Sequence, residues 1–171
     1  MNLTSPRGTF PSLLAALCGI VCALGCGAAP LPRTADERAA DLGETRALEV
    51  IRAKLTQLTF RTTDDWDVDI GGEQPLRVDV RLGTGNFGIE YVTAQDRVDN
   101  AALPPRPRTR ELQILPGAND FARAQVLLLD ESSYRFDPHV EHVQAGETSA
   151  ADAEGRLDRD VADFIEYVRG Q

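Results

Sequence analysis

Apolar and polar residues alternate through the middle of the chain, and this period of two constrains the fold more than any other feature. The alternation covers residues 66–70, 76–82 and 87–91. Apolar runs at 112–115 and 125–129 predict two further strands, and residues 134–136 predict a short edge strand. Glycines within residues 83–86 predict a hairpin loop between the second and third strands. Alternation gives each strand one buried and one wet face, which is typical of antiparallel sheets.

Helical periodicity flanks this strand region on both sides. On the N-terminal side, residues 34–37 have the form of a capping box, and an apolar face follows at Leu48, Ile51, Leu55 and Leu58. Gly43 weakens that segment by about 1 kcal/mol relative to alanine, so it contains one helix or two. At the C-terminal end an apolar stripe stops at Gly170 and consists of Leu157, Val161, Phe164, Ile165 and Val168. The sequence therefore predicts an α+β fold, an antiparallel sheet with an N-terminal and a C-terminal helix packed on one face.

An irregular arm rich in proline and arginine interrupts the pattern at residues 99–111. Its prolines favour polyproline II and exclude a central strand. Three arginines alternate along it, namely Arg106, Arg108 and Arg110. On an acidic chain such a basic strip is a candidate partner-binding site for an acidic protein or for anionic lipid or glycan headgroups. The alternative is a solvated loop.

The N-terminus carries a short basic region and an apolar run of secretory length. Arg7 precedes an apolar run at residues 10–24, which is shorter than a membrane span. The run ends in Ala23-Leu24-Gly25-Cys26. This motif resembles the lipobox of bacterial lipoproteins, in which a small residue precedes a cysteine that is diacylated before cleavage. The alternatives are ordinary signal-peptidase cleavage after Ala28 or Ala29 and an uncleaved anchor.

The resemblance covers the first 27 residues and implies how the chain is organised. Residues 1–25 would be the signal peptide, residues 26–33 a lipidated tether and residues 34–171 a single α+β domain. Acyl chains such as palmitate on Cys26 would bind the membrane through the hydrophobic effect. The implied location is the bacterial cell envelope, lipid-anchored and facing the periplasm, with the outer membrane expected. All three cysteines lie at or before Cys26, so residues 34–171 have no disulfide.

Composition excludes one class of partner. The chain has 18 Lys+Arg against 27 Asp+Glu, a formal net charge of -9, whereas a nucleic-acid partner requires a basic face to neutralise phosphates. We therefore expect no nucleic-acid partner. The sequence also contains no established catalytic motif and no motif that predicts a cofactor, so we assign no catalytic residues and expect no cofactor.

Two segments match known motifs only in part. Residues 82–88 resemble the glycine-rich loop of protein kinases, but the remaining kinase motifs are missing from the chain, and the glycines favour a plain hairpin. Residues 65–71 begin like an EF-hand calcium loop. Ile70 and Leu76 stand where that loop needs glycine and glutamate, so an amphipathic strand with an acidic wet face is favoured.

Both histidines of the chain lie within four residues, at His139 and His142, with Glu141 between them. Imidazole and carboxylate are ligands for zinc or copper, so these three residues are the candidate metal site. Their spacing differs from that of zinc proteases, and solvated loop histidines are the alternative.

Three functions remain open on the sequence. The favoured hypothesis is an envelope lipoprotein that binds a protein partner, or serves as an accessory subunit of an envelope complex, without catalysis. The alternative is a small metal-dependent hydrolase that uses His139, Glu141 and His142. A third hypothesis is a small-ligand carrier that uses the concave side of the sheet.

Overall fold

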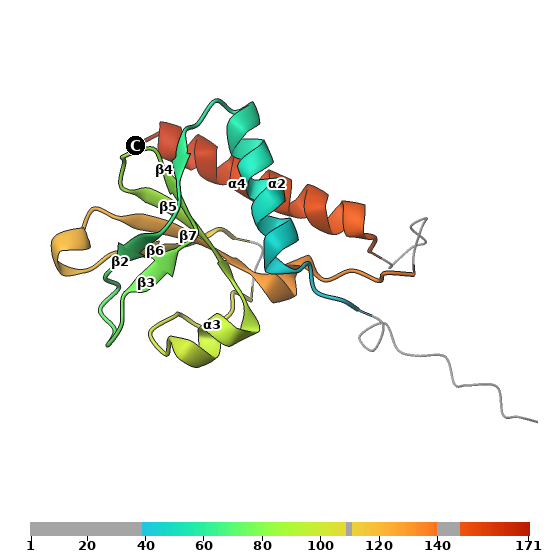
Figure 1. The fold of residues 1–171 in the computed structure, drawn as a ribbon, viewed down its shortest axis with the longest axis horizontal. Helices are drawn as coiled ribbons and strands as arrows, with labels where there is room; N and C mark the ends of the chain where they lie inside the picture. Colours follow the sequence, from blue (N-terminus) through green and yellow to red (C-terminus); the bar gives the residue numbers. More distant parts are fainter. Residues whose placement is uncertain (1–38, 109–110, 140–147) are drawn as a thin grey trace, which may run out of the picture. The chain divides into compact units, whose positions relative to one another are not determined.

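The computed structural model describes residues 39–108, 111–139 and 148–171, which form a five-stranded sheet, a two-stranded sheet and flanking helices (Figure 1). The strands are β1 (Thr62–Thr63), β2 (Trp66–Val68), β3 (Leu76–Val78), β4 (Val80–Leu82), β5 (Phe87–Val92), β6 (Gln113–Pro116) and β7 (Gln125–Asp130). The helices are α2 (Glu44–Gln57), α3 (Ala94–Asp99) and α4 (Ala150–Arg169), with 3-10 turns η1 (Asn119–Phe121) and η2 (Glu131–Tyr134). The large sheet has the order β1-β4-β5-β7-β6, and β2 pairs with β3.

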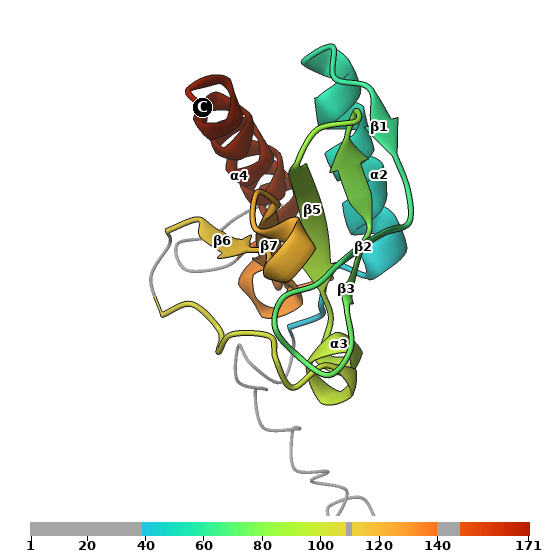
Figure 2. The same ribbon diagram turned by 90° about the vertical axis from the view of Figure 1, so that its left-hand side faces the viewer.

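Helices α2 and α4 pack together over one face of the large sheet, which confirms the predicted α+β fold (Figure 2). Helix α2 buries Ala47, Ile51 and Leu55, whereas the predicted Leu48 and Leu58 are only partly buried. Helix α4 buries four of the five predicted stripe residues together with Ala153, and Val168 packs at the edge. Gly43 is the N-cap of α2, so this helix starts after the glycine. Residues 34–37 lie outside the described residues.

One strand pair differs from the antiparallel arrangement. Strands β5 and β7 run parallel, from Phe87 opposite Gln125 to Val92 opposite Asp130, whereas the other pairs of the large sheet are antiparallel. Both strands are buried on two faces, which is typical of parallel strands. The alternation in β5 suggested a wet face because Gly88 and Glu90 are not hydrophobic, yet both are buried.

The small sheet covers the second face of the large sheet. Val68, Leu76 and Val78 form a core there with Val92, Ala124, Val126 and Leu128. Gly88 makes this close approach possible, because a Cβ atom on it would lie 2.7 Å from Val78 Cγ1 and 3.2 Å from two ring atoms of Trp66. The domain thus has a core on each face of its central sheet.

The hairpin predicted at residues 83–86 joins β4 to β5, with Val80 opposite Ile89 and Arg81 opposite Gly88. Gly83 has a φ of 59°, a conformation that glycine adopts at little cost. The edge strand predicted at 134–136 does not form. Tyr134 ends η2, and Phe136 makes a single antiparallel bridge with Ala40.

Candidate binding surface at the ends of strands β5 and β7

Strands β5 and β7 are parallel neighbours, so their carboxyl ends meet at one edge of the sheet. Val92 and Asp130 are paired there, and the chain continues into α3 after β5 and into η2 after β7. Polar and charged side chains gather at this edge and hold α3 and the arm in place.

Asp130 is the centre of that network. Its side chain is only 2% exposed, and its Oδ2 accepts a hydrogen bond of 2.7 Å from Arg97 Nε. Its Oδ1 accepts hydrogen bonds from the backbone amide of Ser132, at 3.0 Å, and from Ser132 Oγ. Burial raises the pKa of Asp130, but the hydrogen bonds from Ser132 and Arg97 outweigh it, and the pKa lies below its ordinary value. Asp130 is therefore a buried carboxylate in the structure.

Helix α3 is attached through its polar groups. Thr93 and Asp96 form a capping box, with Thr93 N donating to Asp96 Oδ2 at 2.7 Å and Asp96 N donating to Thr93 Oγ1 at 3.2 Å. The amide of Ala94 donates to Glu131 Oε2 at 3.1 Å, and Arg97 reaches Asp130. No residue of α3 is buried. Val98 is 76% exposed and is the one large hydrophobic side chain in the described part of the chain that is exposed.

The arm is fixed to the same network. Arg97 Nη1 donates to the carbonyl of Pro104 at 2.7 Å, and Gln113 Nε2 donates to the carbonyl of Pro105 at 3.2 Å. Arg106 is half exposed and lies 3.5 Å from Asp130 Oδ1. Arg108 is exposed, and Arg110 lies outside the described residues. We name the exposed side chains of this segment the α3–arm surface, namely Ala94, Gln95, Val98, Asp99, Ala101, Ala102, Pro105, Arg106 and Arg108.

The N-terminal part of the described chain joins the domain beside η2. Ala40 N donates to Phe136 O at 2.7 Å, and Phe136 N donates to Ala40 O at 2.9 Å. Arg135 pairs with Asp41 at 3.2 Å, and Tyr91 Oη donates to the carbonyl of Leu42. The chain therefore enters at the same end of β5 and β7 as the α3–arm surface (Figure 1).

Of the three residues of the candidate metal site, only His139 lies within the described residues. His139 is exposed, and its backbone amide donates to Asp137 Oδ1 at 2.9 Å. Glu141 and His142 lie outside the described residues. Within residues 39–108, 111–139 and 148–171, no group of three or more His, Cys, Asp or Glu is placed to hold a metal ion.

The two partial motifs have structural roles. Asp65 pairs with Arg77 at 2.6 Å, and Asp69 accepts hydrogen bonds from Gly71 N at 2.8 Å and Asn119 Nδ2 at 2.7 Å. The hydrogen bonds from Asn119 and Gly71 lower the pKa of Asp69. In the glycine hairpin, Arg81 Nε donates to the carbonyl of Gly85 at 3.0 Å. These contacts belong to turns and ion pairs.

Two neighbouring acidic residues, Glu90 buried and Asp79 partly buried, went unrecognised in the sequence. Asp79 lies between β3 and β4, and Glu90 in β5 is only 5% exposed. Asp79 N donates to Glu90 Oε2 at 3.0 Å, and Tyr91 N donates to Asp79 Oδ2 at 2.8 Å. Burial and the neighbouring Asp79 raise the pKa of Glu90 to about 9, and burial also raises the pKa of Asp79. The alternation of apolar and polar residues had predicted that both side chains lie on a solvent-exposed face of the sheet.

Comparisons with family models, with curated proteins and with solved structures found no match to this chain. No family is assigned. No helix in the described residues has the length and apolar character needed to cross a membrane.

Proposed function

We propose that the protein is an envelope lipoprotein, anchored through acyl chains on Cys26 and facing the periplasm from the outer membrane. In this proposal its domain binds a protein partner as an accessory subunit and performs no catalysis. The resemblance of residues 23–26 to a lipobox supports the anchor. The α3–arm surface supports the binding role, and the exposure of α3 is the observation that carries it.

Helix α3 has the properties of an interaction element. It has six residues, and helices this short are not stable in water by themselves, so the capping box and Arg97 keep it in place. These contacts leave Val98 and the small apolar residues after it exposed. Protein interfaces are typically built from an apolar centre with arginine enriched around it, and Arg106 and Arg108 supply that charge.

The place where the chain enters the domain fits this proposal. Residues 26–38 could span at most about 45 Å when fully extended. They would join the domain at Ala40, at the same end of the sheet as α3. A partner bound to the α3–arm surface would therefore lie within tether length of the membrane, where tethering raises the effective concentration of the two proteins.

Site-specific crosslinking in the native membrane would test the binding role. A photo-crosslinking amino acid at position 98 should yield one defined adduct, because Val98 is at the centre of the proposed interface. The matched control is position 123, since Arg123 is exposed and precedes the opposite end of β7. An adduct from position 123 and none from position 98 would contradict the proposal. Introducing Val98→Asp together with Arg106→Glu should abolish capture by a crosslinker at position 101.

A further inference from the structure

We propose that Asp79 and Glu90 share a single proton. We further propose that the hydrogen bond made by this proton stabilises the corner at which the chain passes from the small sheet to the large sheet.

The corner consists of one residue. Strand β3 ends at Val78 and β4 begins at Val80, so Asp79 alone connects the two sheets. The register of β4 with β5 places Val80 opposite Ile89, and one more step along each strand sets Asp79 opposite Glu90. Strand pairing stops there because β3 turns away to pair with β2.

The two carboxyl groups satisfy the backbone amides that the corner leaves without strand partners. Glu90 Oε2 accepts from the amide of Asp79 at 3.0 Å, and Asp79 Oδ2 accepts from the amide of Tyr91 at 2.8 Å. A buried amide without an acceptor would cost about 1–3 kcal/mol. The two side-chain carboxyl groups therefore take the place of the missing backbone carbonyls of the strand ladder.

The facing carboxyl groups of Asp79 and Glu90 require one proton between them. The carboxyl groups of Asp79 and Glu90 lie together at the corner, because each accepts a hydrogen bond from a backbone amide of the opposite strand, and a hydrogen bond between two carboxyl groups needs one protonated partner. Glu44 at the start of α2 and Asp96 in α3 face the pair and add negative potential there. Two buried carboxylates in contact would repel each other, whereas one shared proton turns this repulsion into a hydrogen bond.

Loss of the proton would act on two elements. The repulsion between Asp79 and Glu90 would open the corner and loosen the small sheet above β5. Glu90 also lies two residues before the end of β5, and Asp96 caps α3 directly beyond it. The shared proton therefore also determines how firmly the start of α3 is held, and we expect both elements to loosen at alkaline pH.

Side-chain carboxyl titration of the full chain, followed by NMR, would test the shared proton directly. Glu90 should lose its proton near pH 9, and the signals of Asp79 should move in the same steps because the two groups titrate as a pair. A Glu90 that titrates near its ordinary value of 4.5, independently of Asp79, would overturn the proposal.

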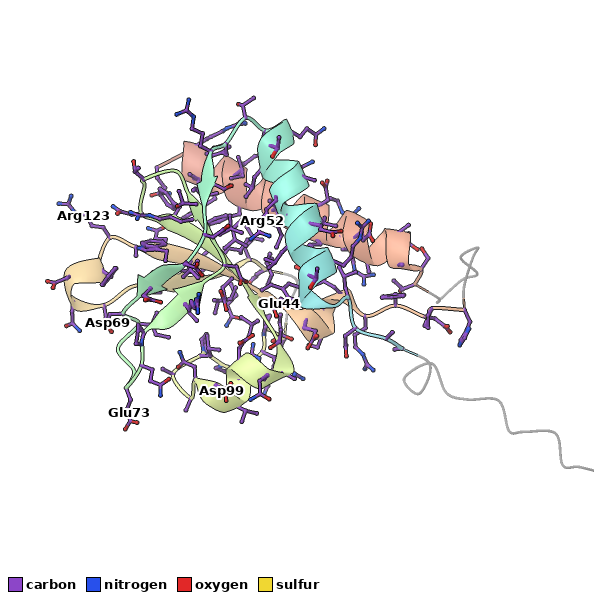
Figure 3. All side chains as sticks on the ribbon, viewed as in Figure 1. Glu44, Arg52, Asp69, Glu73, Asp99 and Arg123 are labelled. Atoms are coloured by element: carbon purple, nitrogen blue, oxygen red, sulfur yellow. The ribbon has the colours of Figure 1, made fainter. Side chains whose placement is uncertain are left out.

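Hydrogen exchange at the corner provides the second measurement. In the wild-type chain, after correction for the intrinsic rate, protection of the amides of Asp79, Tyr91 and Ala94 should fall at least about tenfold between pH 7 and pH 10. Glu90→Gln keeps an acceptor for the Asp79 amide and a donor for its carboxylate, so its protection should not change over this range. The control is Glu73→Gln, because Glu73 projects from the loop between β2 and β3 (Figure 3) and should behave like wild type. Equal pH dependence in all three chains would refute the role of the shared proton at the corner. If Glu90→Gln does not fold, the titration of the wild-type chain decides.

Discussion

The guanidinium of Arg97 and the carboxylate of Asp130 form a nearly buried ion pair between α3 and the end of β7. The two side chains are 16% and 2% exposed, and Arg97 Nη1 also donates to the carbonyl of Pro104. Arg97 thus links the strand end, the short helix and the arm.

Replacing Arg97 by alanine should destabilise the domain by about 3–5 kcal/mol, because Asp130 would remain buried without its charge partner. Denaturant unfolding at pH 7 measures this change. Arg106→Ala is the matched control, since Arg106 is half exposed and more distant from Asp130, and it should cost at most about 1 kcal/mol. The pKa of Asp130 is lowered in the folded chain, so the contribution of the pair should be lost as pH falls below the ordinary pKa of aspartate. Equal effects of the two substitutions would contradict the assigned role of Arg97.

Gly88→Ala should destabilise the domain by about 1–3 kcal/mol, because the new methyl group would overlap Val78 and the ring of Trp66. Gly155→Ala in α4 is the control with the opposite expected sign. The nearest atom to a Cβ at Gly155 is the end of the Arg159 side chain, at 3.8 Å, so the better helix propensity of alanine should add up to about 1 kcal/mol. Thermal melts of both variants decide whether the small sheet packs as closely as described.

Phe164→Ala should destabilise the domain by about 3–5 kcal/mol, since Phe164 is fully buried between α4 and the sheet. Its ring meets that of Phe87 edge to face at a centroid distance of 6.4 Å. Val98→Ala is the comparison, because Val98 is exposed and its loss should leave the unfolding midpoint unchanged. A clear loss of stability in Val98→Ala would mean that α3 is more deeply packed than the structure shows.

Glu90→Gln should become progressively more stable than wild type as pH rises from about 4.5 to about 9. In this range the folded wild-type chain holds a proton on Glu90 that the unfolded chain has lost, so its stability falls with increasing pH by up to about 1.4 kcal/mol per unit. Below pH 4.5 both states are protonated, and the difference between the two chains should be constant. Denaturant midpoints across this range, with Glu73→Gln in parallel, measure the effect. A constant difference throughout would show that Glu90 titrates as an ordinary glutamate.

Cys26→Ser should prevent acylation, because the thioether to the lipid forms only on a cysteine sulfur. The expected result in the native host is accumulation of unprocessed precursor, seen as a larger band that no longer incorporates labelled fatty acid. Cys22→Ser is the control and should be processed normally. Release of normally cleaved, soluble protein from Cys26→Ser would favour ordinary signal-peptidase cleavage instead.

The periodicity of apolar residues predicted those features of the fold that depend on residues close together in the sequence. The buried stripes of α2 and α4 and the positions of the strands follow from periodicity, because each depends only on neighbouring residues. The parallel pairing of β5 with β7 could not be predicted in this way, since it joins residues 38 positions apart and is buried on both faces. Helix α3 escaped detection because it buries nothing and has no apolar stripe.

The candidate sites were likewise predictable only where neighbouring residues define them. Arg106 was recognised from its spacing in the arm, but its contact with Asp130 depends on the end of β7 and needed the fold. In the sequence, Asp79 and Glu90 have the positions of residues on a solvent-exposed face, whereas in the fold Glu90 is buried and Asp79 is partly buried. One signal was present, because a hairpin over residues 83–86 sets these two acids opposite each other. The lipobox at residues 23–26 and most of the histidine cluster lie outside the described residues.

The bridge between Ala40 and Phe136 would have a mechanical consequence under the proposed membrane anchor. Tension between a membrane and a bound partner would enter the domain through the chain before Ala40. Two backbone hydrogen bonds, of 2.7 Å and 2.9 Å, pass that force to Phe136, six residues beyond the end of β7. While these two bonds hold, part of the pull would pass to the segment after β7 instead of to the first turn of α2, which starts at Glu44.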